Sequence, residues 1–546
     1  MRSKNFGLHL VTSRWLTVFA SILIMSVNGA TYLFGLYSND IKSTLGYDQT
    51  TLNLISFFKD LGGNLGIISG LINEVTPPYV VLGVGAFMNF FGYFMIWLSI
   101  TRRIAKVHVW QICLYIWIGA DSQAFANTGS LITCVKNFPQ SRGIVLGLLK
   151  GFVGLSGAII IQLFHALHGN NTKSLVLLIV NNRGQKNELK VFYRLLYISL
   201  GLAGFLMIII IIQNRLTLNK LEYIVSASIV IILLFIPLLV VTKEEFRAWK
   251  EMKILVSHIK CPESEEKEQP KSISCAKNVF SPPERGEDYT ILQTLFSIDM
   301  LILFIATTCG IGGTLTAIDN LGQIGKSLGY PTSSITTFVS LVSIWNYLGR
   351  VAAGFASEIF LTKYKFPRPL MLTFVLLFSC VGHMLIAFAV PNSLYISSVI
   401  IGFCGGAQWP LLFAIISEIF GLKYYSTLFQ FGAVASPIGA YVLNVKVAGH
   451  LYDKEAIKQL AAEGLTRKTG QDLTCFGGEC YRLSFVIITV TTLFGCLISL
   501  ILVLRTREFY RSDIYKKFRD ESKAETMMDL PDSLQENQVP RHPIGK

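Results

Sequence analysis

Residues 57–78, FFKDLGGNLGIISGLINEVTPP, are an apolar run that ends in the pattern Gly70-x-x-x-Glu74. The same pattern, Gly354-x-x-x-Glu358, closes a second apolar run in the other half of the chain. Residues 45–47 and 328–330, both Leu-Gly-Tyr, precede these runs at nearly the same separation. An internal repeat on this scale indicates a chain built from two related halves.

The composition is typical of a membrane protein. Hydrophobic residues make up 52% of the 546 residues and charged residues only 15%, whereas soluble domains carry roughly 25% charged residues. The net charge of +14 does not indicate nucleic-acid binding, because the basic residues lie on short loops between apolar runs, where they set orientation. The first run, 15–37, is too long for a signal-peptide core, so we expect it to remain as a span.

Thirteen apolar runs are long enough to cross a bilayer core of about 30 Å as helices. They are 15–37, 49–72, 79–101, 107–135, 141–167, 191–213, 223–242, 296–322, 332–357, 369–390, 393–420, 426–447 and 482–504. Basic residues in 1–14 and 505–519 place both chain ends in the cytoplasm, which requires an even number of spans. Segment 174–190, SLVLLIVNNRGQKNELK, has an apolar core too short to cross. We expect it to be the remnant of a deleted span, which puts the transport competence of this chain in doubt.

Several segments resemble known families. The two Gly-x-x-x-Glu loops resemble the signature loop of the major facilitator superfamily, although the first copy lacks the basic residues that usually follow. Similarity to the plant nodulin-like family covers residues 57–78, 122–143 and 150–159. Similarity to the carboxyl-terminal half that this family shares with nuclear-fusion-defective-four-like proteins covers residues 343–354 and 402–421.

The resemblance implies an all-α polytopic membrane protein with the major facilitator fold. That fold has two pseudo-symmetric six-helix bundles, here with one or two extra spans before a central cytoplasmic loop. In such carriers the solute binds between the two halves near the bilayer midplane. The expected domains are a cytoplasmic N-terminus (1–14), a nodulin-like N-terminal transmembrane half (15–242), a cytoplasmic loop (243–295), a C-terminal transmembrane half (296–504) and a cytoplasmic tail (505–546).

The second span carries a charged pair, Lys59 and Asp60, near its middle. Ionisable residues inside a membrane are costly, so each is a functional candidate. Asp60 shares a helix face with Ser56 and Asn64 and is interpreted as a proton acceptor or substrate contact, with Lys59 as its charge partner. The alternative is a structural pair that holds this helix to a neighbour. Small residues at every fourth position predict close helix packing; they are Gly62, Gly66 and Gly70.

Polar residues recur on other spans of both halves. Packing or hydrogen bonding between helices explains any single one as well as solute contact does, but together they predict a path for a polar solute. Residues 408–410, Gln-Trp-Pro, fall in the middle of a span and are expected to break the helix and face the cavity. The predicted substrate or proton path comprises Asn28, Tyr32, Lys59, Asp60, Asn64, Asp121, Gln123, Asn127, Asp319, Asn320, Asn346, Arg350, Gln408 and Trp409.

The two repeated loops are predicted to gate the inner side of the path. The expected gating residues are Gly70, Glu74, Gly354 and Glu358. We expect Glu358 to pair with Arg350. We expect Glu74 to contact a helix N-terminus, where negative charge is favoured.

Other predictions concern the span ends and loops. Arg142, at the start of the fifth span, is interpreted as reaching the membrane surface. Cys475 and Cys480 lie in the loop before the last span and are expected to form a disulfide, with a zinc site as the alternative, although a second pair of ligands is missing. Asn170 begins an Asn-Asn-Thr glycosylation sequon. We expect no metal and no other cofactor.

The predicted function is secondary transmembrane transport of a small polar or anionic solute by alternating access. The sequence has no phosphate-binding loop and no enzyme motif, which argues against an ATP-driven pump and against an enzyme. Carboxylates inside the spans add proton coupling as a further hypothesis. The alternative is a non-transporting membrane regulator or sensor on the same scaffold. Expected partners are a small-molecule solute and the lipid bilayer but no nucleic acid, the chain is expected to be monomeric, and its membrane (plasma membrane, vacuole or endoplasmic reticulum) is not distinguished.

Overall fold

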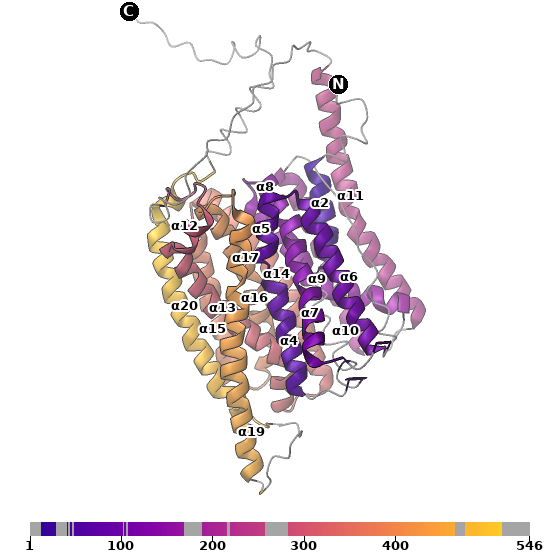
Figure 1. Cartoon of the computed structure of the whole chain (residues 1–546), viewed down its shortest axis with the longest axis vertical. Helices are drawn as coiled ribbons and strands as arrows, with labels where there is room; N and C mark the ends of the chain where they lie inside the picture. Colours follow the sequence, from indigo (N-terminus) through magenta and orange to yellow (C-terminus); the bar gives the residue numbers. More distant parts are fainter. Residues whose placement is uncertain are drawn as a thin grey trace, which may run out of the picture.

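The computed structural model describes residues 13–28, 41, 44–45, 49–101, 103–104, 107–168, 188–215, 219–256, 282–462, 464 and 475–515. Within these residues all regular secondary structure is helical. Nine helices of this described part are long and apolar enough to cross a membrane. Figure 1 shows the helices as one upright bundle, with α15 and α20 along one side and α10 and α11 along the other.

The helices fall into two halves that follow each other along the chain, as the repeat predicts. The N-terminal half contains α2 (Arg14–Val27), α4 (Gln49–Asn64), α5 (Ile67–Val75), α6 (Pro78–Ile100), α7 (Val109–Ala126), η2 (Asn127–Ile132), α8 (Thr133–Asn137), α9 (Arg142–His168), α10 (Glu188–Arg215) and α11 (Lys220–Val256). The C-terminal half contains α12 (Ile291–Leu295), α13 (Ile298–Ser327), α14 (Thr332–Tyr364), α15 (Arg368–Ala387), α16 (Ser393–Ile419), α17 (Tyr425–Ala433), α18 (Ala435–Ala440), η4 (Tyr441–Gly449), α19 (His450–Ala462) and α20 (Glu479–Arg511).

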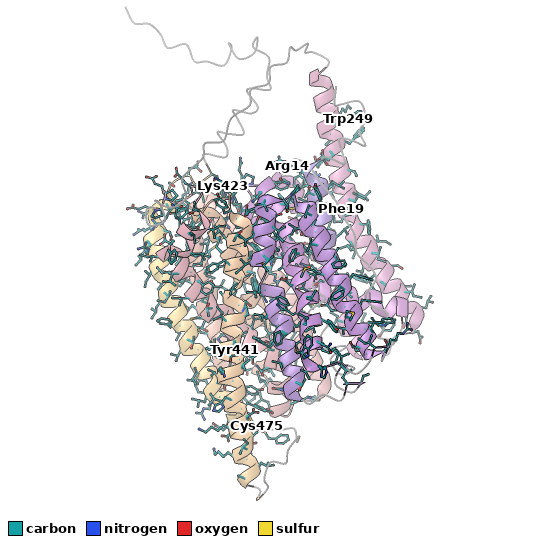
Figure 2. All side chains as sticks on the ribbon, viewed as in Figure 1. Arg14, Phe19, Trp249, Lys423, Tyr441 and Cys475 are labelled. Atoms are coloured by element: carbon teal, nitrogen blue, oxygen red, sulfur yellow. A yellow bond between two sulfur atoms is a disulfide. The ribbon has the colours of Figure 1, made fainter. Side chains whose placement is uncertain are left out.

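The two ends of the bundle differ in what they carry. Arg14 and Lys423 lie at one end and Cys475 lies at the opposite end (Figure 2). We call the first the inner end, because α2 begins there and the charge pattern predicts that it faces the cytoplasm. The end that carries Cys475 is the outer end.

The predicted span 49–72 is not one continuous helix. It is divided into α4 and α5, with Leu65 and Gly66 between them. A Cβ atom added to Gly66 would lie 2.3 Å from the Cβ atom of Ala124 on α7. The backbone therefore passes α7 more closely than any side chain would permit, and glycine supplies both the approach and the break.

The predicted helix break at Gln-Trp-Pro, residues 408–410, is wrong. Helix α16 continues through Pro410 from Ser393 to Ile419. Its neighbours hold it in place: a Cβ atom added to Gly406 would lie 2.0 Å from the carbonyl oxygen of Asn346 on α14. Packing this close keeps a proline-containing helix intact inside a membrane bundle.

The central loop is shorter than the predicted range 243–295. Helix α11 continues to Val256. Within it, Glu244 forms ion pairs with Arg194 of α10 at 2.5 Å and with Arg247 at 3.2 Å. On the far side of the loop, the backbone N–H of Gly286 donates to the carbonyl oxygen of Ile419 at 2.9 Å. Both edges of the predicted loop are therefore attached to the helical bundle. The last helix is likewise longer than predicted, because α20 ends at Arg511 rather than at 504.

Some predictions lie outside the described residues. These are the assignments for Tyr32 and for the sequon residue Asn170, the shortened segment as far as residue 187, and the tail beyond residue 515. Four predicted spans, 15–37, 49–72, 107–135 and 332–357, are not among the nine apolar helices. The first is described only to residue 28 and the second is broken. The other two are more polar, which suits helices that face a path rather than lipid.

Candidate functional site

Glu74 joins the two halves at the inner end. Its Oε1 accepts hydrogen bonds from the backbone N–H groups of Ser426 at 3.1 Å and Thr427 at 3.4 Å. Both groups lie in the first turn of α17, where the helix dipole attracts negative charge. Lys136 balances the carboxylate, with its Nζ 3.6 Å from Oε2. The structure thus places Glu74 of the N-terminal half on a helix N-terminus of the C-terminal half.

Glu358 makes the reciprocal contact. Its Oε2 accepts from the backbone N–H of Gly143 at 3.0 Å, in the first turn of α9. The repeated glycines permit both contacts: an added Cβ at Gly354 would lie 2.5 Å from the carbonyl oxygen of Gly143, and one at Gly70 would lie 2.7 Å from the Cα atom of Thr427. Each copy of Gly-x-x-x-Glu therefore places its backbone against, and its carboxylate on, the start of a helix in the opposite half.

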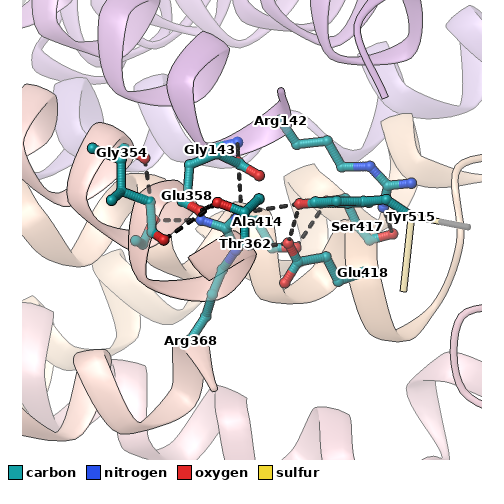
Figure 3. A network of polar contacts seen from close by, with 12 residues as sticks. Arg142, Gly143, Gly354, Glu358, Thr362, Arg368, Ala414, Ser417, Glu418 and Tyr515 are labelled. Carbon is teal, nitrogen blue, oxygen red and sulfur yellow. Dashed lines mark hydrogen bonds and ion pairs between the residues drawn. The ribbon is translucent and has the colours of Figure 1, made fainter. Parts of the chain in front are cut away.

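Arg368, and not Arg350, is the cation beside Glu358 (Figure 3). Its Nη2 lies 2.7 Å from Glu358 Oε2 and its Nε lies 2.6 Å from Glu418 Oε1, and the arginine side chain is fully buried. The predicted pairing with Arg350 is wrong because Arg350, two turns earlier on α14, donates instead to the carbonyl oxygen of Lys150 at 2.8 Å. One guanidinium thus bridges the ends of α14 and α16, which carry the two glutamates.

The start of the predicted tail completes this inner network. The hydroxyl of Tyr515 donates to Glu418 Oε1 at 2.9 Å and accepts from Arg368 Nη2 at 3.1 Å. Burial, together with the charges of Glu358 and Glu418, raises the pKa of Tyr515 well above its ordinary value, so its hydroxyl stays a donor at neutral pH. Residue 515 is therefore part of the contact between helices and not of a free tail.

Arg142 is also buried and does not reach the surface as predicted. Its Nη1 donates to the carbonyl oxygen of Ser417 at 2.6 Å, and its guanidinium lies 5.8 Å from the ring centroid of Tyr515. The side chain connects the start of α9 to the end of α16, across the two halves. An arginine at the end of a span can lie at the membrane surface or between helices. The prediction failed because the sequence does not show which helix packs beside Arg142.

The centre of the bundle holds a lysine that was not among the predicted path residues. Lys150 lies about two turns, roughly 12 Å, from the inner start of α9 and is 8% exposed. Its Nζ lies 3.4 Å from Asn127 Oδ1 and faces the rings of Trp409, Phe413 and Phe429. A depth of two turns within an apolar run was the available signal, since a lysine that deep reaches the surface less easily.

Nearer the outer end, charged and amide side chains of both halves form a second cluster. Lys59 Nζ lies 2.9 Å from Asp60 Oδ1 on α4, and both residues interact electrostatically with Asp319 on α13. Asn444 on η4 donates to Asp319 Oδ2 at 3.2 Å and accepts from Asn320 at 2.7 Å. The Asp60 side chain is 44% exposed although it lies in mid-span. The structure therefore brings Lys59, Asp60, Asp319 and Asn320 together.

The remaining predicted path residues lie apart from the surroundings of Lys150 and from the cluster of Asp60 and Asp319, or they support one of these two groups. Asn28 donates to the carbonyl oxygen of Gln123 at 3.3 Å, within the N-terminal half. Asp121 is 5% exposed, and its Oδ1 has no hydrogen-bond partner among the described residues. Gln408 donates to the carbonyl oxygen of Cys404 at 3.2 Å, within its own helix. Asn64 donates to the backbone of Asp60, and Asn346 lies one turn before Arg350.

Cys475 and Cys480 are joined by a disulfide at the outer end. The backbone N–H of Cys475 donates to the hydroxyl of Tyr452 on α19 at 3.1 Å. The bridge therefore holds the chain beside α19 before it enters α20. Within the described ranges, no group of three or more His, Cys, Asp or Glu side chains is placed to hold a metal ion.

The comparison with known proteins agrees with this two-halved geometry. A Nodulin-like family model matches residues 14–242, and a model of the NFD4 C-terminal domain matches residues 287–512. The N-terminal half therefore resembles the Nodulin-like family, and the C-terminal half resembles the NFD4 C-terminal domain. The whole chain is 24% identical over 538 residues to Protein NUCLEAR FUSION DEFECTIVE 4 of Arabidopsis thaliana, an alignment that covers 91% of the chain and 89% of the relative.

Two other proteins bear on the fold and its class. The Probable transporter MCH1 of Wickerhamomyces anomalus is 22% identical over 431 residues, covering 78% of this chain and 77% of the relative. The solved structure of the proton:xylose symporter XylE bound to 6-bromo-6-deoxy-D-glucose superposes with a TM-score of 0.51 at 13% identity, covering 88% of this chain and 94% of that one. The expected fold, the major facilitator fold of an integral multi-pass membrane protein, is confirmed.

Proposed function

We propose that this protein is a secondary transporter that moves a small polar or anionic solute by alternating access. The observation that carries the proposal is the reciprocal pair of inner contacts, Glu74 on α17 and Glu358 on α9. Each contact joins the two halves through a few polar groups, so each can break and re-form as the halves rock about a central site. Nearer the outer end, the exposed Asp60 lies where the halves face each other, which fits a state closed inside and open outside.

The proposal is tested by solute uptake into liposomes that contain the purified full chain. A panel of small carboxylates, sugars, amines and amino acids is offered outside, and uptake is compared with protein-free liposomes. We expect saturable uptake of at least one class. Because one chain supplies both halves of the path, we expect a monomer to be the transporting unit. Absence of uptake across the panel, in protein that binds none of these solutes, would favour the regulator or sensor reading.

Proton coupling is a second part of the proposal and rests on Asp60 and Asp319. Two carboxylates from opposite halves interact with one lysine, so a proton bound by either carboxylate would change the charge balance between the halves. We expect Asp60→Asn and Asp319→Asn each to abolish uptake driven by a pH step while leaving solute exchange at equal pH. Glu455→Gln, which removes the surface carboxylate beside Lys458, is the matched control. Flux that ignores the pH gradient, or that survives both substitutions, removes the proton claim.

A further inference from the structure

The ammonium group of Lys150 occupies an unusual position between the two halves. It is held by Asn127 Oδ1 at 3.4 Å, and its Nζ lies 5.2 Å from the ring centroids of Phe413 and Phe429 and 5.6 Å from that of Trp409. An ammonium carries three donors, and this single long contact uses one of them. Aromatic faces attract a cation but neutralise no charge. The group is thus buried with its charge uncompensated by these neighbours.

A second cation lies beside it. Arg350 is 4% exposed, and its Nη1 donates to the carbonyl oxygen of Lys150 at 2.8 Å. The two side chains repel each other electrostatically. Within the described part of the chain, no carboxylate forms an ion pair with Lys150. Two buried positive charges, one from each half, therefore lie close enough to interact.

Arg368 in the inner network shows how a buried cation of this chain is neutralised. Arg368 is fully buried, and two carboxylates lie within 2.7 Å of its guanidinium. Burial of a charge without a partner is strongly unfavourable, so the contrast with Lys150 needs a reason. An anion that enters from outside would supply the missing partner.

We propose that Lys150 and Arg350 bind the anionic group of the transported solute, a small organic anion with a planar or apolar body. This inference rests on the proposed transport function and narrows it to one solute class. The carboxylate or equivalent group takes the unused donors of Lys150 and displaces the contact with Asn127. The planar or apolar body lies against the rings of Trp409 and Phe413, because these rings border the ammonium and aromatic faces bind flat apolar groups well.

The position of Lys150 between the two halves suits a solute whose binding drives the change between the inward-open and outward-open states. Lys150 and Asn127 belong to the N-terminal half, whereas Arg350, Trp409, Phe413 and Phe429 belong to the C-terminal half. An anion bound here contacts both halves at once, as alternating access requires. A contact that merely fastened the halves together would need the lysine and the rings but would have no preference among solutes.

Binding of defined probes to the purified full chain separates these two roles. Benzoate, phenylacetate and pyruvate are compared with the neutral isostere benzamide at constant ionic strength, with quenching of tryptophan fluorescence and the shift in Tm as readouts. We expect the carboxylates to bind and benzamide not to. Lys150→Gln should weaken carboxylate binding on the order of 10- to 100-fold, whereas Lys150→Arg should retain most of it. Lys423→Gln, which removes an exposed lysine that lies 5.3 Å from the ring of Tyr424, should leave binding unchanged.

The outcomes also separate this inference from the transport proposal. Equal binding of benzoate and benzamide, unchanged carboxylate binding in Lys150→Gln, or no binding of any of the three carboxylates to the unaltered protein would overturn the anion site. Uptake of a neutral solute by both the unaltered protein and Lys150→Gln would overturn it while leaving a transporter in place. Carboxylate binding that depends on Lys150, without uptake into liposomes, would support the site and contradict the transport proposal.

Discussion

Replacing Arg368 with glutamine should destabilise the protein by about 3–5 kcal/mol. The substitution leaves Glu358 and Glu418 buried beside each other without their shared cation, and Glu358 is only 4% exposed and Glu418 only 2%. Breaking a buried pair by removing one partner costs far more than a surface pair contributes. The expected result is a large loss of unfolding free energy in a detergent titration and a lower Tm.

A surface arginine and a charge-neutral variant control this experiment. Arg482 pairs with Glu479 at 2.7 Å in an exposed position, so Arg482→Gln should cost less than about 1 kcal/mol. The triple variant Arg368→Met, Glu358→Gln, Glu418→Gln removes the charges together and should recover much of the lost stability. Equal stability of Arg368→Gln and Arg482→Gln would show that the inner network contributes nothing to the fold.

Replacing Gly354 with valine should hold the inner end open. The added Cβ would lie 2.5 Å from the carbonyl oxygen of Gly143 and from the Cα atom of Gly147, both backbone atoms of the opposite half. Backbone cannot move aside as a flexible side chain can, so the two halves must separate there. We expect a cysteine placed at Ser426, which is fully buried at the start of α17, to react with a membrane-impermeant maleimide much faster in this variant than in a Ser426→Cys parent.

Gly201→Val provides the matched control for this variant. An added Cβ at Gly201 on α10 meets no atom within 4 Å, while the change in helix propensity is the same. Its labelling rate should equal that of the Ser426→Cys parent. If the Gly354→Val variant labels at the parent rate and retains its Tm, the close approach of Gly354 to α9 does not hold the inner end closed.

These two predictions concern the contact between the two halves at the inner end, which the sequence indicated in part. The two Gly-x-x-x-Glu motifs predicted a pair of equivalent inner loops, and the structure places Glu74 and Glu358 on equivalent helix N-termini of opposite halves. The repeat could be recognised because each motif is local, with its glycine and glutamate one turn apart on the same helix. Which helix each motif contacts depends on tertiary packing, so it could not be recognised from the residues of the motif.

The errors have the same origin. Glu358 was assigned to Arg350 because both lie on α14, but its partner Arg368 lies on α15. Arg142 was assigned to the membrane surface, and Lys150 was left out of the path, although both are buried between the halves. A cation at the start of an apolar run has the same local sequence whether it meets lipid headgroups or another helix. Only the neighbouring helices decide between these two environments.

The sequence by itself determined that this is a two-halved helical membrane protein with Nodulin-like and NFD4 C-terminal segments, and it located the paired inner loops. Hydrophobic length and repeated motifs carry that information because each span is largely specified by its own residues in a bilayer. The tertiary structure alone decided which charges meet. It joined Arg368 to two glutamates, brought Asp60 and Asp319 together, and left Lys150 facing three rings with no ion-paired carboxylate among the described residues. These contacts depend on how helices far apart in the chain pack, and close packing at glycines such as Gly354 sets that arrangement.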